Sequence, residues 1–218
     1  MITHLERELE EVKFKIFEMQ DLAIEAILKS VNSLKGSDIK LAEEVIRDDS
    51  QLDKLEITID DDCIRILVTK QPAAIHLRFV LAMLKINTDV ERIGDLAVNI
   101  AKETIKLNGK PTLKPLIDIP RMANLCIEMI KDSFISISEM DENKAKCIIE
   151  KDKDIDALNL QIYRELFSFM AENPRTISEA LGLIMAAKAL ERIGDHATNI
   201  AERAIYYIKG VDVRHFEK

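Results

Sequence analysis

Glu91–Asp95 reads Glu-Arg-Ile-Gly-Asp, and Glu191–Asp195 repeats these five residues unchanged. Asn-Ile-Ala follows both copies, at 99–101 and at 199–201. Each copy lies within a helical pattern of apolar residues, so its Glu and its Asp are one turn apart on the same helix face. Because two like charges at that spacing destabilise a helix, each acidic face requires a positive partner. The repeat predicts two similar halves, each carrying such a face.

Apolar residues recur at helical spacing on both sides of this stretch. In the first half they predict helices over about 5–34, 38–70 and 73–108, and the same pattern returns in the second half. A segment with Gly109, Pro111 and Pro115 separates the halves. We therefore predict an all-α fold of two tandem, pseudo-symmetric three-helix bundles with six long helices: residues 1–109, a linker at 110–117, and residues 118–218. A coiled coil is the alternative, but the heptads are not sustained.

Composition restricts the functional classes. The net charge of −8 argues against a nucleic-acid partner, since phosphate backbones require a basic surface. The three cysteines show no CxxC spacing and indicate neither a disulfide framework nor a thiolate zinc site. The N-terminus lacks the apolar segment of a signal peptide, and the longest apolar runs are too short to cross a bilayer. We expect a cytoplasmic protein that meets membranes only through partners.

A second row of acids lies one helix before each repeated stretch, at the same spacing. Antiparallel packing would bring these rows face to face, Asp49 and Asp53 with Glu91 and Asp95, and Asp152 and Asp156 with Glu191 and Asp195. Two unit charges 4 Å apart interact by about 4 kcal/mol at an effective dielectric constant near 20. Such clusters require cations, basic neighbours or raised pKa values. All-oxygen ligands suit Mg²⁺, Mn²⁺ and Ca²⁺, and iron where carboxylates bridge. The alternative is a solvated helix face neutralised by Arg92, Arg192 and local lysines.

Enzymatic signals are weak. The Glu-x-x-His motif of di-iron bundles does not occur, nor does a phosphate-binding loop or a nucleophile elbow. His196 follows Asp195, but its counterpart in the first half is Leu96, so we interpret His196 as a surface residue. We assign no catalytic residue and expect no enzyme. A metal-binding helical scaffold and a carboxylate-metal enzyme remain as alternatives.

Several stretches together resemble the PhoU family of bacterial phosphate-transport accessory and regulatory proteins. They are the two Glu-Arg-Ile-Gly-Asp copies, Gln71-Pro72 with the following Leu77-Arg78-x-Val80, Arg175-Thr176-Ile177, and the ending from Tyr206 to His215. The resemblance covers nearly the whole chain. It implies two three-helix bundles, usually in a homodimer, whose acidic motifs bind multinuclear iron or zinc clusters.

The resemblance also implies a role. The family restrains phosphate uptake and phosphate-starvation signalling through contacts with the ATPase of the phosphate ABC transporter and with the phosphate-sensing histidine kinase. By position, it assigns metal ligation to the eight acids of the two clusters, Asp49, Asp53, Glu91, Asp95, Asp152, Asp156, Glu191 and Asp195. Asn99 and Asn199 are weaker additions.

Overall fold

The fold is a bundle of long helices. The computed structural model describes residues 3–107 and 113–213, and no strand occurs among them. The elements are α1 (His4–Gly36), α2 (Ile39–Asp48), α3 (Ser50–Lys70), α4 (Ala74–Lys106), α5 (Asp118–Glu139), α6 (Glu142–Glu172), the short 3₁₀ helix η1 (Pro174–Thr176) and α7 (Ile177–Lys209). The prediction of an all-α fold is confirmed.

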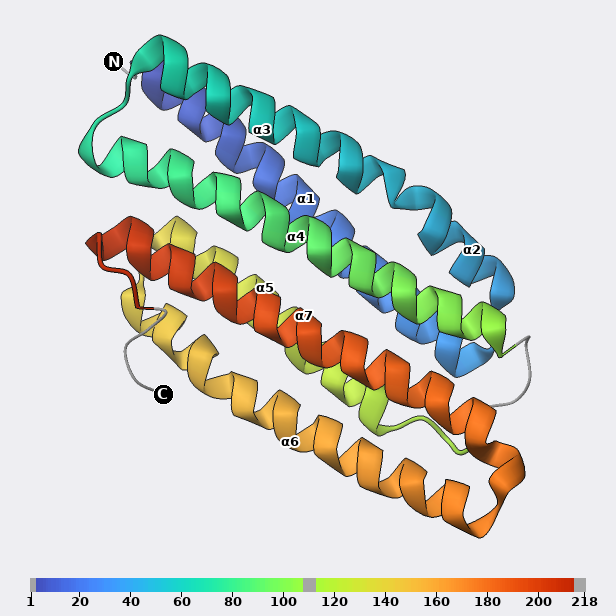
Figure 1. Cartoon of the computed structure of the whole chain (residues 1–218). Coiled ribbons are helices and arrows are strands. Elements are labelled where there is room, and N and C mark those ends of the chain that lie inside the picture. Colours follow the sequence, from blue (N-terminus) through green and yellow to red (C-terminus); the bar gives the residue numbers. More distant parts are fainter. Residues whose placement is uncertain (1–2, 108–112, 214–218) are drawn as a thin grey trace.

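The helices form two groups that lie side by side, α1 to α4 and α5 to α7 (Figure 1). In the first group α1 and α3 pack against α4, and in the second α5 and α6 pack against α7. The central helices α4 and α7 run antiparallel and contact each other along their length (Figure 1). Their isoleucine and alanine stripes are fully buried, as the sequence predicts: Ile86, Ile93, Ala97 and Ile100 in α4, and Ala186, Ile193, Ala197 and Ile200 in α7.

One continuous hydrophobic core joins the two groups. Besides the contact between α4 and α7, α1 packs against α5. There the ring of Phe17 meets the ring of Phe134 edge to face, with 5.1 Å between centroids. Phe134 is among the largest fully buried side chains. The groups therefore stabilise each other through shared apolar contacts.

The expected single helix over 38–70 is interrupted. It divides into α2 and α3 at Asp49, which keeps helical dihedral angles of φ −53° and ψ −34°. Ser50 Oγ donates a hydrogen bond to the carbonyl of Arg47 at 3.2 Å across this junction. Figure 1 shows α2 continuing α3 as one bent rod. The bend lets α2 cover Val98 of α4 through Ala42 and Val45.

The domain boundaries stay a prediction. The first ends at residue 109 and the linker begins at 110, and both positions lie in 108–112, outside the described residues. Within the described part, 115–117 are not helical and α5 begins at Asp118, where we expect the second unit to start.

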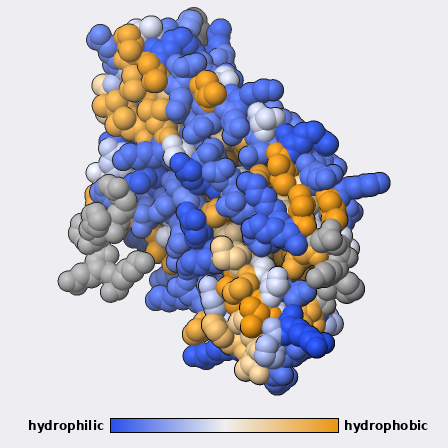
Figure 2. Space-filling view, turned by 45° about the vertical axis from the view of Figure 1, so that its right-hand side comes forward, coloured by the Kyte–Doolittle hydropathy of each residue, from blue (hydrophilic) through white to orange (hydrophobic). Residues whose placement is uncertain are grey.

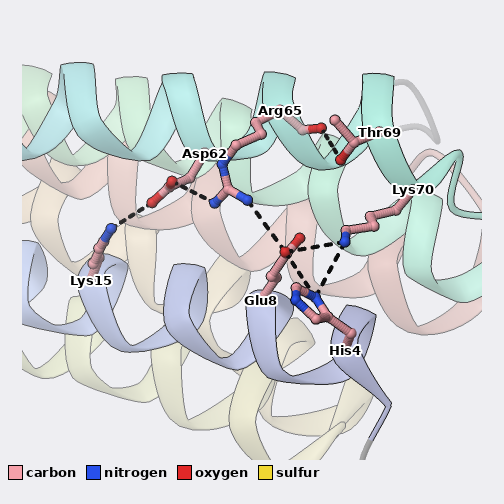
Figure 3. A network of polar contacts seen from close by, with 7 residues as sticks. All are labelled: His4, Glu8, Lys15, Asp62, Arg65, Thr69 and Lys70. Carbon is pink, nitrogen blue, oxygen red and sulfur yellow. Dashed lines mark hydrogen bonds and ion pairs between the residues drawn. The ribbon is translucent and has the colours of Figure 1, made fainter.

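A polar network ties α1 to α3 (Figure 3). The side chain of Glu8 is 8% exposed. Its Oε1 atom lies 3.0 Å from His4 Nδ1, 3.4 Å from Arg65 Nη1 and 3.3 Å from Lys70 Nζ. One turn before Arg65, Asp62 pairs with Arg65 at 2.8 Å and with a lysine of α1. The buried carboxylate of Glu8 is thus the centre on which three basic groups converge.

Glu8→Ala removes that centre and leaves the charges of Arg65 and Lys70 facing each other without their carboxylate. We expect the free energy of unfolding to fall by about 1–2 kcal/mol, because the basic groups stay partly hydrated. Urea unfolding curves measure the change. Glu11→Ala, at an exposed position of the same helix, is the matched control and should leave the curve unchanged. Equal curves for the two variants would contradict the assigned role.

The surface carries separate apolar patches divided by hydrophilic side chains (Figure 2). Phe14 and Val68 are among the most exposed large apolar residues, at 72% and 70%. None of the helices in the described ranges combines the length and apolar character that a membrane span requires.

Candidate metal centres

The first acidic cluster lies where the bend between α2 and α3 faces the middle of α4. Asp49 occupies the bend and Asp53 lies one turn later, while α4 contributes Glu91 and Asp95. The structure therefore brings the four predicted residues of the first half to one contact between helices. Burial raises the pKa of Asp49 to about 6, and the charges of Asp53 and Asp95 add to the shift. The carboxylates of the two helices thus repel one another.

Glu56 and Glu91 belong to the same electrostatic group. Burial raises the pKa of Glu56, and Asp60 and Asp53 raise it further. The pKa of Glu91 is also raised, first by burial and then by Asp95, while Arg92 opposes the shift. Glu56 lies on the acidic row of α3 but was not among the assigned ligands. Its signal in the sequence is its spacing, one turn after Asp53.

Arg92 supplies part of the neutralisation that the solvated-face alternative requires. Its guanidinium lies 3.4 Å from Glu91 Oε2 and 3.2 Å from Asp95 Oδ2. The Arg92 side chain is 54% exposed, so these pairs contribute little to stability. Because the raised pKa values of Glu91 and Asp49 persist beside it, Arg92 only partly offsets the negative charge.

Gly94 explains how closely the acidic bend approaches α4. A Cβ atom at this position would lie 2.5 Å from Leu52 Cδ1 and 3.3 Å from Asp49 Oδ1. Only glycine leaves room for the buried leucine and the carboxylate together. In the second half a Cβ at Gly194 would lie 3.3 Å from Ile155 Cγ2 and 3.4 Å from Asp152 Oδ1. The repeated glycine therefore brings an aspartate against the central helix in both halves.

The second cluster repeats the arrangement with α6 and α7. Burial raises the pKa of Asp195, and Glu191 and Asp156 raise it further, while Lys188 opposes the shift. Lys188 Nζ lies 2.6 Å from both oxygens of Glu191. The assigned residues of this half are Asp152, Asp156, Glu191 and Asp195, from α6 and α7. Here a lysine rather than an arginine pairs with the glutamate.

Both clusters suit a cation in chemistry more than in their present geometry. Their ligands are carboxylate oxygens, as hard cations prefer, and the repulsion within each cluster would be relieved by a positive ion. Among the described residues, however, no three His, Cys, Asp or Glu side chains are placed to share one ion. An ion would therefore require the carboxylates to rotate toward it, and each assigned ligand stays a prediction.

A buried amide fixes the far end of the first acidic row. Asn87 is fully buried in α4 and donates to the carbonyl of Glu56 and to Asp60 Oδ1, both at 2.9 Å. This pair of hydrogen bonds sets the register between α3 and α4. Sequence reasoning missed Asn87 because its partners are distant in the chain.

The interpretation of His196 as a surface residue is wrong. Its side chain is 17% exposed, and Nδ1 lies 2.9 Å from Asp89 Oδ1 across the contact between α7 and α4. Asn199 donates to the same oxygen at 3.2 Å. Antiparallel packing of the central helices places these residues opposite each other, which a comparison of residue types in the two halves does not reveal. Asn199 thus contacts the other repeat, so its weaker assignment as a ligand lacks support from this geometry.

Fold and site define a class of protein: an all-helical chain of two tandem three-helix repeats, each with an acidic face at a glycine. The family model described as the PhoU domain matches the chain twice, at residues 16–104 and 119–204. The chain belongs to the PhoU family.

Relatives match the chain over nearly its whole length. The phosphate-specific transport system accessory protein PhoU homolog of Aquifex aeolicus is 44% identical and covers 96% of this chain and 95% of its own. The homolog of Pseudomonas aeruginosa is 36% identical, with 95% and 86% covered.

Solved structures agree. The crystal structure of PhoU from Pseudomonas aeruginosa has a TM-score of 0.89 at 35% identity and covers 94% of this chain and 99% of that one. The phosphate transport system regulatory protein PhoU from Streptococcus pneumoniae has a TM-score of 0.90 at 27% identity, with 96% and 99% covered. The predicted two-repeat fold is thereby confirmed.

Proposed function

We propose that this protein is a regulator of phosphate uptake that restrains transport and phosphate-starvation signalling when phosphate is plentiful. One observation carries the proposal: relatives named as accessory proteins of the phosphate-specific transport system match 96% and 95% of the chain. A match of that extent includes both repeats and both acidic faces, so it is not confined to a shared structural element.

In finer detail, we propose an adaptor that acts in the cytoplasm as a homodimer. Its partners would be the ATPase subunit of the phosphate ABC transporter and the phosphate-sensing histidine kinase. The separate apolar patches on the surface offer places for such contacts, because exposed apolar side chains favour protein partners. The acidic surface also suits partners with basic patches.

Deletion of the gene in its own host tests the regulatory role. We expect a transcriptional reporter of phosphate starvation to stay on in phosphate-rich medium, and the wild-type gene on a plasmid should restore repression. A reporter that responds normally in the deletion strain would refute the proposal. Affinity capture of the tagged protein with cross-linked membranes should yield the transporter ATPase and the kinase, and capture of neither would refute the adaptor role.

Metal binding at the two acidic clusters is the second part of the proposal. Desolvation and mutual repulsion raise the pKa values of Asp49, Glu91 and Asp195, as expected of carboxylates arranged to receive positive charge. The proposed ligands are Asp49, Asp53, Glu91 and Asp95 in one cluster and Asp152, Asp156, Glu191 and Asp195 in the other. The cluster chemistry admits iron, zinc, Mg²⁺, Mn²⁺ or Ca²⁺.

Asp95→Ala and Asp195→Ala should each lower the bound metal without unfolding the bundle, because neither residue lies on the buried isoleucine stripe. Elemental analysis of purified protein measures the content, and circular dichroism checks the fold. Asp61→Ala, at an exposed position of α3 outside both clusters, is the control. Wild-type metal content in the double variant would leave a helical scaffold without a metal role.

A further inference from the structure

A basic cleft lies on the surface between the second half of α4 and the first half of α7. Its volume is about 250 Å³. Four basic side chains and one acidic side chain line it: Lys102, Lys106, Lys188, Arg192 and Glu103. Buried Leu96 and Ala189 give the cleft an apolar part, which strengthens electrostatic interactions by excluding water. In a chain with a net charge of −8, this local excess of positive charge attracts anions.

Two of the four basic groups already have carboxylate partners. Lys106 Nζ lies 2.6 Å from Glu103 Oε1, and Lys188 Nζ lies 2.6 Å from Glu191. Lys102 and Arg192 differ, since neither forms an ion pair with any described residue. The equivalent arginine of the first half, Arg92, pairs with both acids of its own repeat. Lys102 acts on Asp49 only at longer range, so neither of these two positive charges is held by an ion pair within the described part of the chain.

The pseudo-symmetry of the chain supplies an internal comparison for this cleft. The repeats of α4 and α7 correspond at a separation of 100 residues, so positions 96 and 189 match positions 196 and 89. At that second place His196 and Asn199 both contact the carboxylate of Asp89. The same backbone arrangement thus accommodates a negative oxygen between the two central helices.

The cleft lacks that carboxylate. We call the place around Asp89, His196 and Asn199 the mate of the cleft. Ala189 stands where the mate has Asp89, and Asn99 is the counterpart of the donor Asn199. Lys102 replaces the acid Glu202. Over all the lining positions the cleft has four bases and one acid, whereas the equivalent positions have three bases and two acids, because Glu103 stands where the mate has Arg203. The cleft is therefore the more positive of the two places and keeps the amide.

We propose that this cleft binds a phosphoryl group, either as free inorganic phosphate or as part of a phosphoanhydride chain. The guanidinium of Arg192 matches phosphoryl oxygens with paired donors, Lys102 adds a point charge, and Asn99 lies beside both on the cleft wall. The bound anion replaces the carboxylate that Asp89 supplies at the mate. The proposal does not depend on the regulatory role. None of the eight assigned metal ligands lines the cleft, and the one contact between the cleft and a cluster that the ion pairs of the described residues show is that of Lys188 with Glu191.

Isothermal titration calorimetry of the full chain with inorganic phosphate and with inorganic triphosphate, in chelator and low salt, tests the proposal. We expect binding of at least one probe, weakened about tenfold or more by Lys102→Glu, the residue type of the mate. Lys85→Glu makes the same charge change on α4 outside the cleft and should alter affinity less than about twofold. Inorganic phosphate bound in chelator identifies the free ion, and binding of triphosphate alone identifies the chain.

A second variant tests the same cleft by a different change, and the melting temperature checks that both variants are folded. Leu96→His combined with Ala189→Asp copies the residues of the mate and should abolish binding by adding a second carboxylate to that of Glu103. A melting temperature within a few degrees of wild type shows that each variant is folded. The proposal fails if neither probe binds, if Lys85→Glu weakens binding as much as Lys102→Glu, or if phosphate binds only after metal is restored and Lys102→Glu has no effect.

Discussion

Phe134→Ala should lower the free energy of unfolding by about 3–5 kcal/mol, the largest stability loss we expect from one substitution. Phe134 is 1% exposed and meets Phe17 edge to face, so its removal creates a cavity where α5 packs against α1. For a chain of this size the melting temperature should fall by roughly 10 °C or more. Thermal and guanidinium unfolding curves measure both quantities.

Phe14→Ala provides the matched control. Phe14 lies in α1, one turn before Phe17, but its side chain is 72% exposed. Its loss should change stability by less than about 0.5 kcal/mol. Because the two helix groups share one continuous core besides Phe134, we expect the variant still to unfold in one transition. A normal melting temperature for Phe134→Ala would contradict the shared core.

Asp49→Asn should stabilise the metal-free protein at neutral pH. Folding raises the pKa of Asp49 from 3.8 to about 6, mainly through burial, so the ionised carboxylate disfavours the folded state. That penalty is absent below pH 3.8, grows as the pH rises and is complete above pH 6. In chelator at pH 7.5 we expect a gain of about 1 kcal/mol, well below the full value of the shift because the group is partly solvated. At pH 4 the gain should almost vanish.

Metal should reverse the order of the two proteins. An ion bound by the first cluster stabilises the wild type by mass action, whereas the variant lacks one carboxylate ligand and gains less. Urea unfolding with and without added metal at pH 7.5 makes the comparison, and Asp61→Asn controls for loss of a surface charge on the adjoining helix. Lower stability of Asp49→Asn in chelator would show that the carboxylate has a favourable partner.

The fold was predictable because the repeated stretch and the apolar spacing are both local signals. The stripe of Ile93 and Ile100 follows from helical periodicity, and it is fully buried as expected. The bend at Asp49 was not predictable from that pattern. It accompanies the packing of α2 over Val98, which is a tertiary contact.

For the candidate sites, the helix faces were predictable from the sequence, but the side-chain contacts were not. Helical spacing placed Glu91 and Asp95 on one face, and the matching rows brought Asp49 opposite them. Spacing does not give side-chain rotamers, so the pairing of Arg92 with its own acids could be stated only as the alternative. It also did not reveal the contact of His196 with Asp89, because the register between α4 and α7 depends on packing across the whole core.

Asp89 of the first repeat corresponds to Ala189 of the second, and this difference makes the two ends of the contact between α4 and α7 unlike. If the two halves were identical, the two ends of the contact between α4 and α7 would be the same. A partner could then bind at either end in the same way. In this chain the carboxylate of Asp89 occupies one end, while the other presents Lys102 and Arg192 without an ion pair among the described residues. After duplication, each half therefore became unable to substitute for the other, and a chain built from two copies of the first half would have no open end.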